Sequence, residues 1–247
     1  MTTVKMHRHV CAFIDVLGGA QLFKGKDKSR AKGFFGCLEE FERRLNGWSL
    51  HFPKKRQSTA LVKTFSDNIF VAFPLKSNSK LSDAEVVALF LLELVGQVRH
   101  LTVMAGFPMR GAVTIGSLMF SDKFLFGPAL VEAVELEKAA VFPRIVLSRS
   151  VTQCIQKNDL YHSIALRDVD GQVFLHYLRD AQLFPSLFAN HRDFVRAGLE
   201  SNLSRIRERQ KYEWLAKYHN HHAHTMGRLD LRVETNLDPY FSPFEKM

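Results

Sequence analysis

Residues 60–73, ALVKTFSDNIFVAF, decide how the first half of this chain can fold. The stretch holds two short apolar runs that are separated only by Ser66, Asp67 and Asn68. Asp and Asn favour tight turns because their short side chains hydrogen-bond to the backbone nearby. Apolar runs on both sides of such a turn predict a β-hairpin with Asp67 at its tip.

A strand and a helix are predicted before this hairpin, and a helix and a strand after it. Residues 9–17 form an apolar, β-prone run, and residues 29–45 carry apolar side chains at helical spacing. Ser82 and Glu85 form a capping-box pattern that opens a long apolar helix, and residues 109–115 form another strand. This order is the split βαβ arrangement of ferredoxin-like and palm domains. We therefore expect an α/β (α+β) fold with a βαββαβ core, in which the helical crossovers bring neighbouring strands back parallel.

The rest of the chain is expected to add strands to this core and to end in a long helix. In order, the patterns predict a loop at 117–126, a helix at 128–140, a strand at 144–147, a hairpin of the runs 160–166 and 173–178, a helix at 188–218 and an extended tail from 223. We expect one domain over residues 1–186, followed by a C-terminal helical extension and tail over residues 187–247.

The composition predicts a soluble, cytoplasmic protein. Of the 247 residues, 46% are hydrophobic and 24% are charged, which is ordinary for a globular domain. The N-terminus lacks an apolar signal core, no apolar run has the length of a membrane span, and the three cysteines form no Cys-x-x-Cys pair. The net charge of +9 favours anionic partners such as nucleotides. Nucleic acid is a weaker candidate, because the basic residues are spread along the chain.

Asp15 lies inside the otherwise apolar first strand. A buried, unpaired carboxylate is strongly disfavoured, so Asp15 needs a cation, a hydrogen-bond network or an exit to solvent. In a split βαβ sheet the end of the first strand approaches the hairpin tip, so Asp15 and Asp67 can face the same end of the sheet. Two such carboxylates bind hard divalent cations such as Mg²⁺, which also takes substrate phosphates. Taken alone, Asp67 is also an ordinary turn residue.

Four segments along residues 9–148 resemble the motifs of class III nucleotide cyclases, in the same order and with similar spacing. They are FIDVLGG (13–19), VKTFSDNIFVAF (62–73), MRGAVTIG (109–116) and FGPALVEAVELEKAA (126–140). The small stand-alone form also resembles the pyrimidine nucleotide cyclases of bacterial Pycsar anti-phage defence. The resemblance implies an enzyme that converts a nucleoside triphosphate to a 3′,5′-cyclic nucleotide and pyrophosphate, working as a homodimer.

Carried over to this chain, the resemblance makes Asp15 and Asp67 the ligands of two Mg²⁺ or Mn²⁺ ions. Lys63 matches the lysine that contacts the base in adenylate cyclases, although an exposed strand lysine that points away explains it equally well. Ser66 replaces the usual glycine before the second Asp. A glycine turn that opens toward a helix presents N–H donors to an anion, so substrate phosphate could bind the backbone of Leu17, Gly18 and Gly19.

A larger departure concerns the residues that stabilise the transition state. The family places an Asn and an Arg on the fourth segment, and Val131 and Glu135 stand at those positions here. Losing that positive charge would cost orders of magnitude in rate unless another cation replaces it. Arg144 is our candidate for the catalytic cation, and Lys138 and Lys211 are also available.

This departure keeps a second function open, namely a catalytically inactive cyclase-like module that binds nucleotide or another protein. A palm-type nucleotidyltransferase is a third option. The chain has no Walker-type loop, no Gly-x-Ser-x-Gly elbow and no His-Glu-x-x-His motif, which argues against P-loop hydrolases, serine esterases and zinc proteases.

A dense histidine cluster near the C-terminus could bind a transition metal. No cysteine or carboxylate lies at ligand spacing from it, so a structural role is favoured. The cluster comprises His219, His221, His222 and His224.

Overall fold

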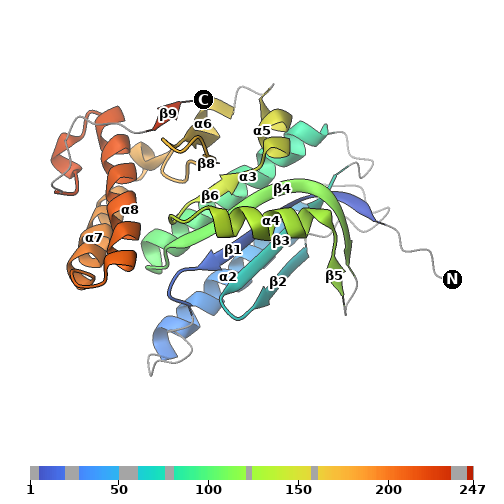
Figure 1. Ribbon diagram of the computed structural model, residues 1–247, viewed down its shortest axis with the longest axis horizontal. Coiled ribbons are helices and arrows are strands. Elements are labelled where there is room, and N and C mark those ends of the chain that lie inside the picture. Colours follow the sequence, from blue (N-terminus) through green and yellow to red (C-terminus); the bar gives the residue numbers. More distant parts are fainter. Residues whose placement is uncertain are drawn as a thin grey trace.

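The computed structural model describes residues 6–19, 28–49, 61–75, 81–120, 124–156, 161–234 and 244–246, arranged as in Figure 1. Its strands are β1 (His7–Val16), β2 (Leu61–Phe65), β3 (Asn68–Pro74), β4 (Met109–Phe120), β5 (Leu125–Phe126), β6 (Ile145–Leu147), β7 (Ala165–Arg167), β8 (Val173–Leu175) and β9 (Glu245–Lys246). Its α-helices are α2 (Lys28–Ser49), α3 (Asp83–Arg99), α4 (Pro128–Ala139), α5 (Arg149–Ile155), α6 (Tyr161–Ile164), α7 (Pro185–Ser201) and α8 (Ile206–Thr225). Short π and 3₁₀ turns cover His100–Met104, Ala181–Leu183 and Leu229–Leu231.

The described strands form one mixed sheet in the order β2-β3-β1-β4-β6-β8-β7-β9, with β5 paired to β4. The predicted βαββαβ core is confirmed as β1-α2-β2-β3-α3-β4. The strands joined by each helical crossover run in the same direction, as expected, but they are not adjacent, because β3 lies between β1 and β2, and β1 lies between β3 and β4. Among the described strands the parallel neighbours are β4 and β6.

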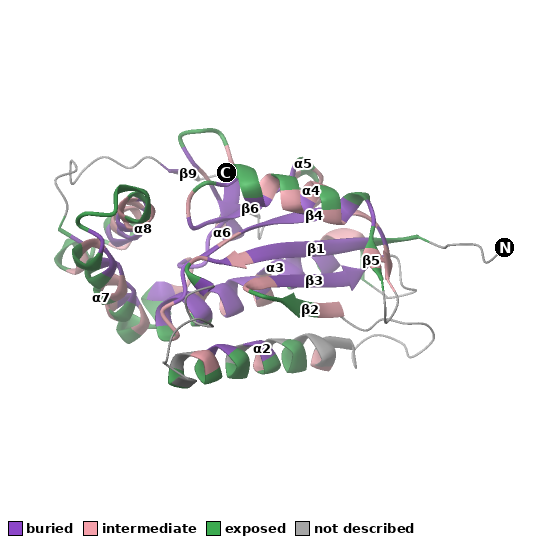
Figure 2. Ribbon diagram, turned by 60° about the horizontal axis from the view of Figure 1, so that its bottom comes forward, coloured by how far each residue is buried: buried purple, intermediate pink, exposed green. Residues whose placement is uncertain are grey.

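The two faces of the sheet bury different cores, because successive side chains of a strand point to opposite sides. Val10 and Ile14 of β1 pack on the side of α2 and α3. Cys11 and Phe13 pack against α4 on the other side. Figure 2 shows α2 and α4 on opposite sides of the strands, each with an exposed outer surface. Asp15 follows Phe13 by two residues and therefore belongs to the α4 side.

The long apolar helix α3 belongs to the first of these cores. Its predicted capping box is confirmed, since the Glu85 N–H donates to Ser82 Oγ (3.3 Å) and the Ser82 N–H donates to Glu85 Oε2 (2.7 Å). In the described part of the chain, Asp83–Met104 is the one segment with the length and hydropathy of a membrane span. Of its most apolar window, 67% is buried inside the fold, which makes it a core helix.

The single helix predicted over residues 188–218 is in fact two helices, α7 and α8, that pack against each other. The chain turns between Asn202 and Ile206, where the Asn202 side-chain amide donates to Gly198 O (2.7 Å). Such side-chain hydrogen bonds compete with the helix ladder, and periodicity alone does not reveal them. Gly198 also permits the close packing, because a Cβ there would lie 2.1 Å from the ring of Tyr212.

Other predicted boundaries differ by a few residues. The run 160–166 begins in the described chain as helix α6 and becomes strand β7 only at Ala165. β4 continues through Gly116 to Phe120 and pairs with β5, where a loop was expected. Glycine inside the strand lets α4 pack closely, because a Cβ at Gly116 would lie 3.0 Å from the Ala129 Cβ of α4. α2 likewise continues beyond its predicted end, to Ser49.

The C-terminal helices share the main core with the sheet. Trp214 and Tyr218 of α8 pack edge-to-face against Phe174 of β8, with ring centroids 5.3 and 5.6 Å apart. β9 pairs with β7 at the edge of the sheet. Residues 235–243 of the predicted tail lie outside the described residues. The division into residues 1–186 and 187–247 stays a prediction.

Candidate metal and nucleotide site

Asp15 and the hairpin tip lie at the same end of the sheet. Asp15 is paired in register with Asn68 of β3 on one side and with Arg110 of β4 on the other. The next residue, Val16, donates its N–H to Asp67 O (3.0 Å), which ties the end of β1 to the β2–β3 turn. The tertiary structure therefore brings the two predicted metal ligands together, although they come from different strands.

The glycine turn after β1 packs directly on Asp67. A Cβ at Gly19 would lie 2.4 Å from the Asp67 Cβ, so only glycine fits there. Gly18 has φ +83°, a left-handed conformation that glycine adopts without strain. Of the predicted phosphate cradle, the Leu17 N–H is already used, because it donates to Pro108 O (2.9 Å).

Ser66 shows why this family pattern favours glycine before the second Asp. Its φ is +59°, in the left-handed region that a side chain disfavours. The Ser66 hydroxyl donates to Asp67 Oδ1 (2.9 Å). Compared with glycine, the serine costs some backbone strain but adds a hydrogen bond that orients the Asp67 carboxylate.

Sequence reasoning missed an ion-pair chain that holds Asp15. Arg110 donates to Asp15 Oδ2 (3.1 Å) and, through Nε, to Glu137 Oε1 of α4 (2.6 Å). Glu137 is 5% exposed, so it needs this partner. One signal was available, because Glu137 continues the buried stripe of Ala129 and Ala133 at four-residue spacing. Glu137 on a buried helix stripe, like Asp15 in an apolar strand, is a carboxylate at a position where it needs a partner.

The electrostatics of the site favour binding of a cation. Burial raises the pKa of the Asp15 carboxyl above its ordinary value, Arg110 opposes that shift, and the negative charges of Glu137 and Asp67 reinforce it. Lys211 of α8 also acts to lower this pKa, which places it near the site. Asp15 and Glu137 share the Arg110 guanidinium, and Asp67 lies near enough to influence the pKa of Asp15. Carboxylate oxygens are ligands that Mg²⁺ and Mn²⁺ accept, so Asp15 and Asp67 have the chemistry that such an ion needs.

Arg144 is not brought to the carboxylate pair. Its guanidinium is 2% exposed and pairs with Asp168 and Asp170, and it lies over the Phe142 ring (5.6 Å to the centroid). Asp168 also accepts from Trp214 Nε1 (2.8 Å). In the structure, Arg144 ties β6 to the loop between β7 and β8 and to α8.

Lys63 rises from the same face of the sheet as Asp15. It is exposed on β2 and paired in register with Phe70, which is itself paired with Phe13 of β1. Directly paired residues share a face, and Phe13 and Asp15 share a face because they are two residues apart. Lys63 therefore lies two strands away from the Asp15 strand, on its side of the sheet.

The two positions of the missing family residues face solvent. Val131 is 56% exposed, and Glu135 is also exposed on α4. Lys138 is exposed on the same helix. The outer surface of α4 therefore supplies no arginine near Asp15, and Lys211 is the one predicted candidate cation that acts on it.

The histidine cluster is largely buried between α7, α8 and the sheet. His219 is fully buried and His222 is 5% exposed, while His224 is exposed. His219 bonds to His191 and to the Leu231 carbonyl. Within the described residues, no group of three or more His, Cys, Asp or Glu side chains is arranged to hold a metal ion.

The sheet order, α4 across one face and the helices on the other are the fold of nucleotide cyclase catalytic domains. No family model and no curated protein sequence matches the chain. The guanylyl cyclase domain of the RhoGC fusion protein from the fungus Blastocladiella emersonii superimposes with a TM-score of 0.50 at 13% identity, covering 68% of this chain and 94% of that one. The adenylyl cyclase CyaB from P. aeruginosa gives 0.49 at 15% identity over 69% and 94% of the two chains. The catalytic core of a rhodopsin-guanylyl cyclase in complex with ATPαS gives 0.49 at 14% identity over 70% and 97%. At 13% identity, the match to the guanylyl cyclase domain shows the fold.

Proposed function

We propose that this protein is a metal-dependent nucleotide cyclase that converts a nucleoside triphosphate to a 3′,5′-cyclic nucleotide and pyrophosphate. One observation carries the proposal: Asp15 and Asp67 meet at one end of the sheet in a cyclase-type fold. Mg²⁺ or Mn²⁺ held there would supply charge neutralisation at the triphosphate and a lower pKa for the attacking 3′-hydroxyl.

The chain's own residues would orient the substrate and the carboxylates. Arg110 and Glu137 fix the Asp15 carboxylate in place. Backbone N–H groups after β1 would approach the phosphates, since the space around Gly18 is open. Lys63, on the same face as Asp15, would contact the base.

Lys211 is the cation that we assign to the transition-state charge. Arg144 is committed to Asp168 and Asp170, whereas the charge of Lys211 helps to lower the pKa of Asp15. A lysine ammonium can neutralise a phosphate charge, although it lacks the two-pronged geometry of arginine. We expect slower turnover than a site with an arginine would give.

The assay is incubation of the purified protein with each of the four ribonucleoside triphosphates and Mn²⁺ or Mg²⁺, followed by mass spectrometry of the products. Asp15→Asn and Asp67→Asn should abolish product, and the exposed Asp193→Asn should not. Lys211→Ala should lower kcat and leave KM nearly unchanged, because the interaction is made mainly in the transition state. Cyclic CMP or cyclic UMP as the preferred product would support pyrimidine specificity and a role in anti-phage signalling. Linear dinucleotides would instead identify a nucleotidyltransferase.

A homodimer is part of this proposal. Large apolar side chains are exposed on the hairpin, on the β4–β5 arm and on α4, and a subunit interface could bury them. Sedimentation should show a dimer that a charged substitution at one of these positions dissociates. A monomer that still forms cyclic nucleotide would refute the dimer but not the proposed cyclase activity. The residues are Phe65, Phe124, Phe126 and Val131.

The alternative is a cyclase-like module that binds nucleotide without turnover. The exposed Val131 and Glu135, at the positions of the family's Asn and Arg, favour it. It predicts metal-dependent binding of a nucleoside triphosphate in calorimetry that Asp67→Asn removes, with no product in the assay above.

A further inference from the structure

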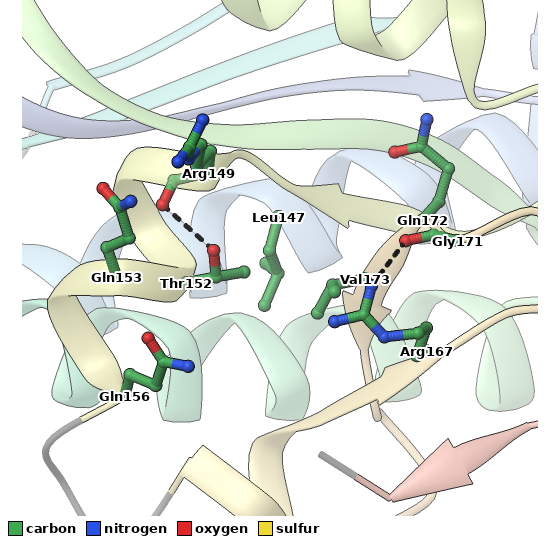
Figure 3. Close-up of a pocket in the computed structure, with 9 residues that line it drawn as sticks. All are labelled: Leu147, Arg149, Thr152, Gln153, Gln156, Arg167, Gly171, Gln172 and Val173. Atoms are coloured by element: carbon green, nitrogen blue, oxygen red, sulfur yellow. Dashed lines mark hydrogen bonds between the residues drawn. The ribbon is translucent and has the colours of Figure 1, made fainter.

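A second cavity lies between α5 and the β7–β8 hairpin, on the face of the sheet opposite to Asp15. Its volume is about 390 Å³. Figure 3 shows side chains of α5 on one side and of the hairpin on the other, with Leu147 and Val173 between them. Leu147 and Val173 belong to the core that includes α3, whereas Asp15 projects on the α4 side. The cavity is therefore separate from the proposed metal site.

Two arginines that form no ion pair with another described residue line this cavity. Arg149 is exposed at the start of α5, and Arg167 of β7 donates to the Gly171 carbonyl (3.1 Å). Neither forms an ion pair within the described chain. The acidic residues next to Arg167 in the sequence, Asp168 and Asp170, are both engaged by Arg144. None of the described lining residues is Asp or Glu, and two of them are arginines.

The remaining lining residues are neutral hydrogen-bonding groups above an apolar floor. Gln153 and Gln156 of α5 and Gln172 of the hairpin bring amides that both donate and accept. Leu147 is 4% exposed and Val173 is 8% exposed, so they form a buried apolar base. A ligand that fits has an anionic group that binds the arginines, polar edges that hydrogen-bond to the glutamines, and a flat or apolar part that lies on Leu147 and Val173.

We propose that this cavity binds a phosphorylated small molecule of nucleotide size. Guanidinium groups match phosphate oxygens with paired N–H donors, and the cavity offers one on the α5 side and one on the hairpin side. The volume lies within the range of small-molecule sites. The inference does not depend on the proposed cyclase activity, because no residue of the carboxylate pair takes part.

The test measures binding of the four ribonucleoside 5′-monophosphates to the full chain by calorimetry, in EDTA and in an Asp15→Asn, Asp67→Asn background. Under these conditions the proposed metal site cannot contribute. We expect at least one nucleotide to bind, and its nucleoside to bind about tenfold more weakly or worse, because the charged hydrogen bonds are lost. Inorganic phosphate should also bind more weakly than the nucleotide, since it leaves the apolar floor unused.

Arg149→Ala and Arg167→Ala should each weaken binding about tenfold or more. Arg149→Lys should lose less, because it keeps the charge. The matched control is Arg207→Ala, which removes an exposed arginine of α8 outside the cavity. Arg149 is exposed, so its variants should unfold at the same temperature as the parent protein. The proposal is overturned if no nucleotide binds near millimolar concentration, or if the double variant Arg149→Ala, Arg167→Ala binds as well as its parent. If the protein forms no cyclic nucleotide but nucleotides bind this cavity as expected, the proposed function is refuted and the cavity proposal is supported.

Discussion

Acidification should destabilise the protein through two buried histidines. Tyr177 OH lies 2.9 Å from His191 Nε2, His191 Nδ1 lies 3.0 Å from His219 Nδ1, and His219 Nε2 lies 2.8 Å from Leu231 O. The carbonyl can only accept, so His219 must carry its proton on Nε2 and accept on Nδ1. His191 then donates from Nδ1 and accepts from Tyr177. Each ring is neutral, and the chain has no place for a further proton.

The direction of the pH effect follows from these contacts. Burial holds the pKa of His219 at about 4 and that of His191 well below the ordinary value of 6.5. The unfolded chain therefore takes up protons as the pH falls through 6.5, while the folded chain does not. Stability is fully present above that range and is lost as the pH falls toward about 4. At about pH 5.5 each histidine should cost on the order of 1 kcal/mol, so the pair should cost a few kcal/mol.

Urea unfolding at about pH 8 and about pH 5.5, followed by tryptophan fluorescence, measures this loss. Trp214 stacks near Tyr218 of the same core and reports on it. His191→Gln and His219→Gln should each be less stable at pH 8 but lose less free energy of unfolding on acidification, by on the order of 1 kcal/mol. His224→Gln, which changes an exposed histidine of the same helix, should follow the parent. Equal free energies of unfolding at the two pH values, or identical losses in all variants, would refute the neutral histidine chain.

Three substitutions test other features by their effect on the free energy of unfolding. Glu137→Ala should cost about 3 kcal/mol or more, because it leaves a partly buried guanidinium without its principal carboxylate; a cost below about 1 kcal/mol would contradict the proposed ion-pair chain. Ser66→Gly should stabilise by up to about 1 kcal/mol by relieving the positive φ, and thermal unfolding that falls instead would show that the hydroxyl bond outweighs the strain. Gly198→Ala should destabilise by about 2 kcal/mol because its Cβ meets the Tyr212 ring, whereas Gly36→Ala, in open space on α2, should stabilise slightly. Equal effects in the two glycine variants would argue against close packing of α7 on α8.

Much of the fold could be predicted because its elements are encoded locally. The β1 run, the hairpin around Asp67 and the capping box at Ser82 each depend on neighbours within a few residues. Errors arose where a distant element decided the outcome. Gly116 was expected to end a strand, but its missing side chain instead makes room for Ala129. The break at Asn202 depends on how α7 meets α8.

The sequence by itself determined that a carboxylate stands in an apolar strand and that a second one stands at a hairpin tip, because strand and turn patterns are local. It did not determine which charges meet. Arg110 and Asp15 are 95 residues apart, and Arg110 and Glu137 are 27 apart. Any of several basic residues could have reached the carboxylates, and Arg144 was chosen from the sequence. Only the tertiary structure decided that Arg144 pairs with Asp168 and Asp170. A buried charge needs a partner of opposite charge, and the fold determines which one lies beside it.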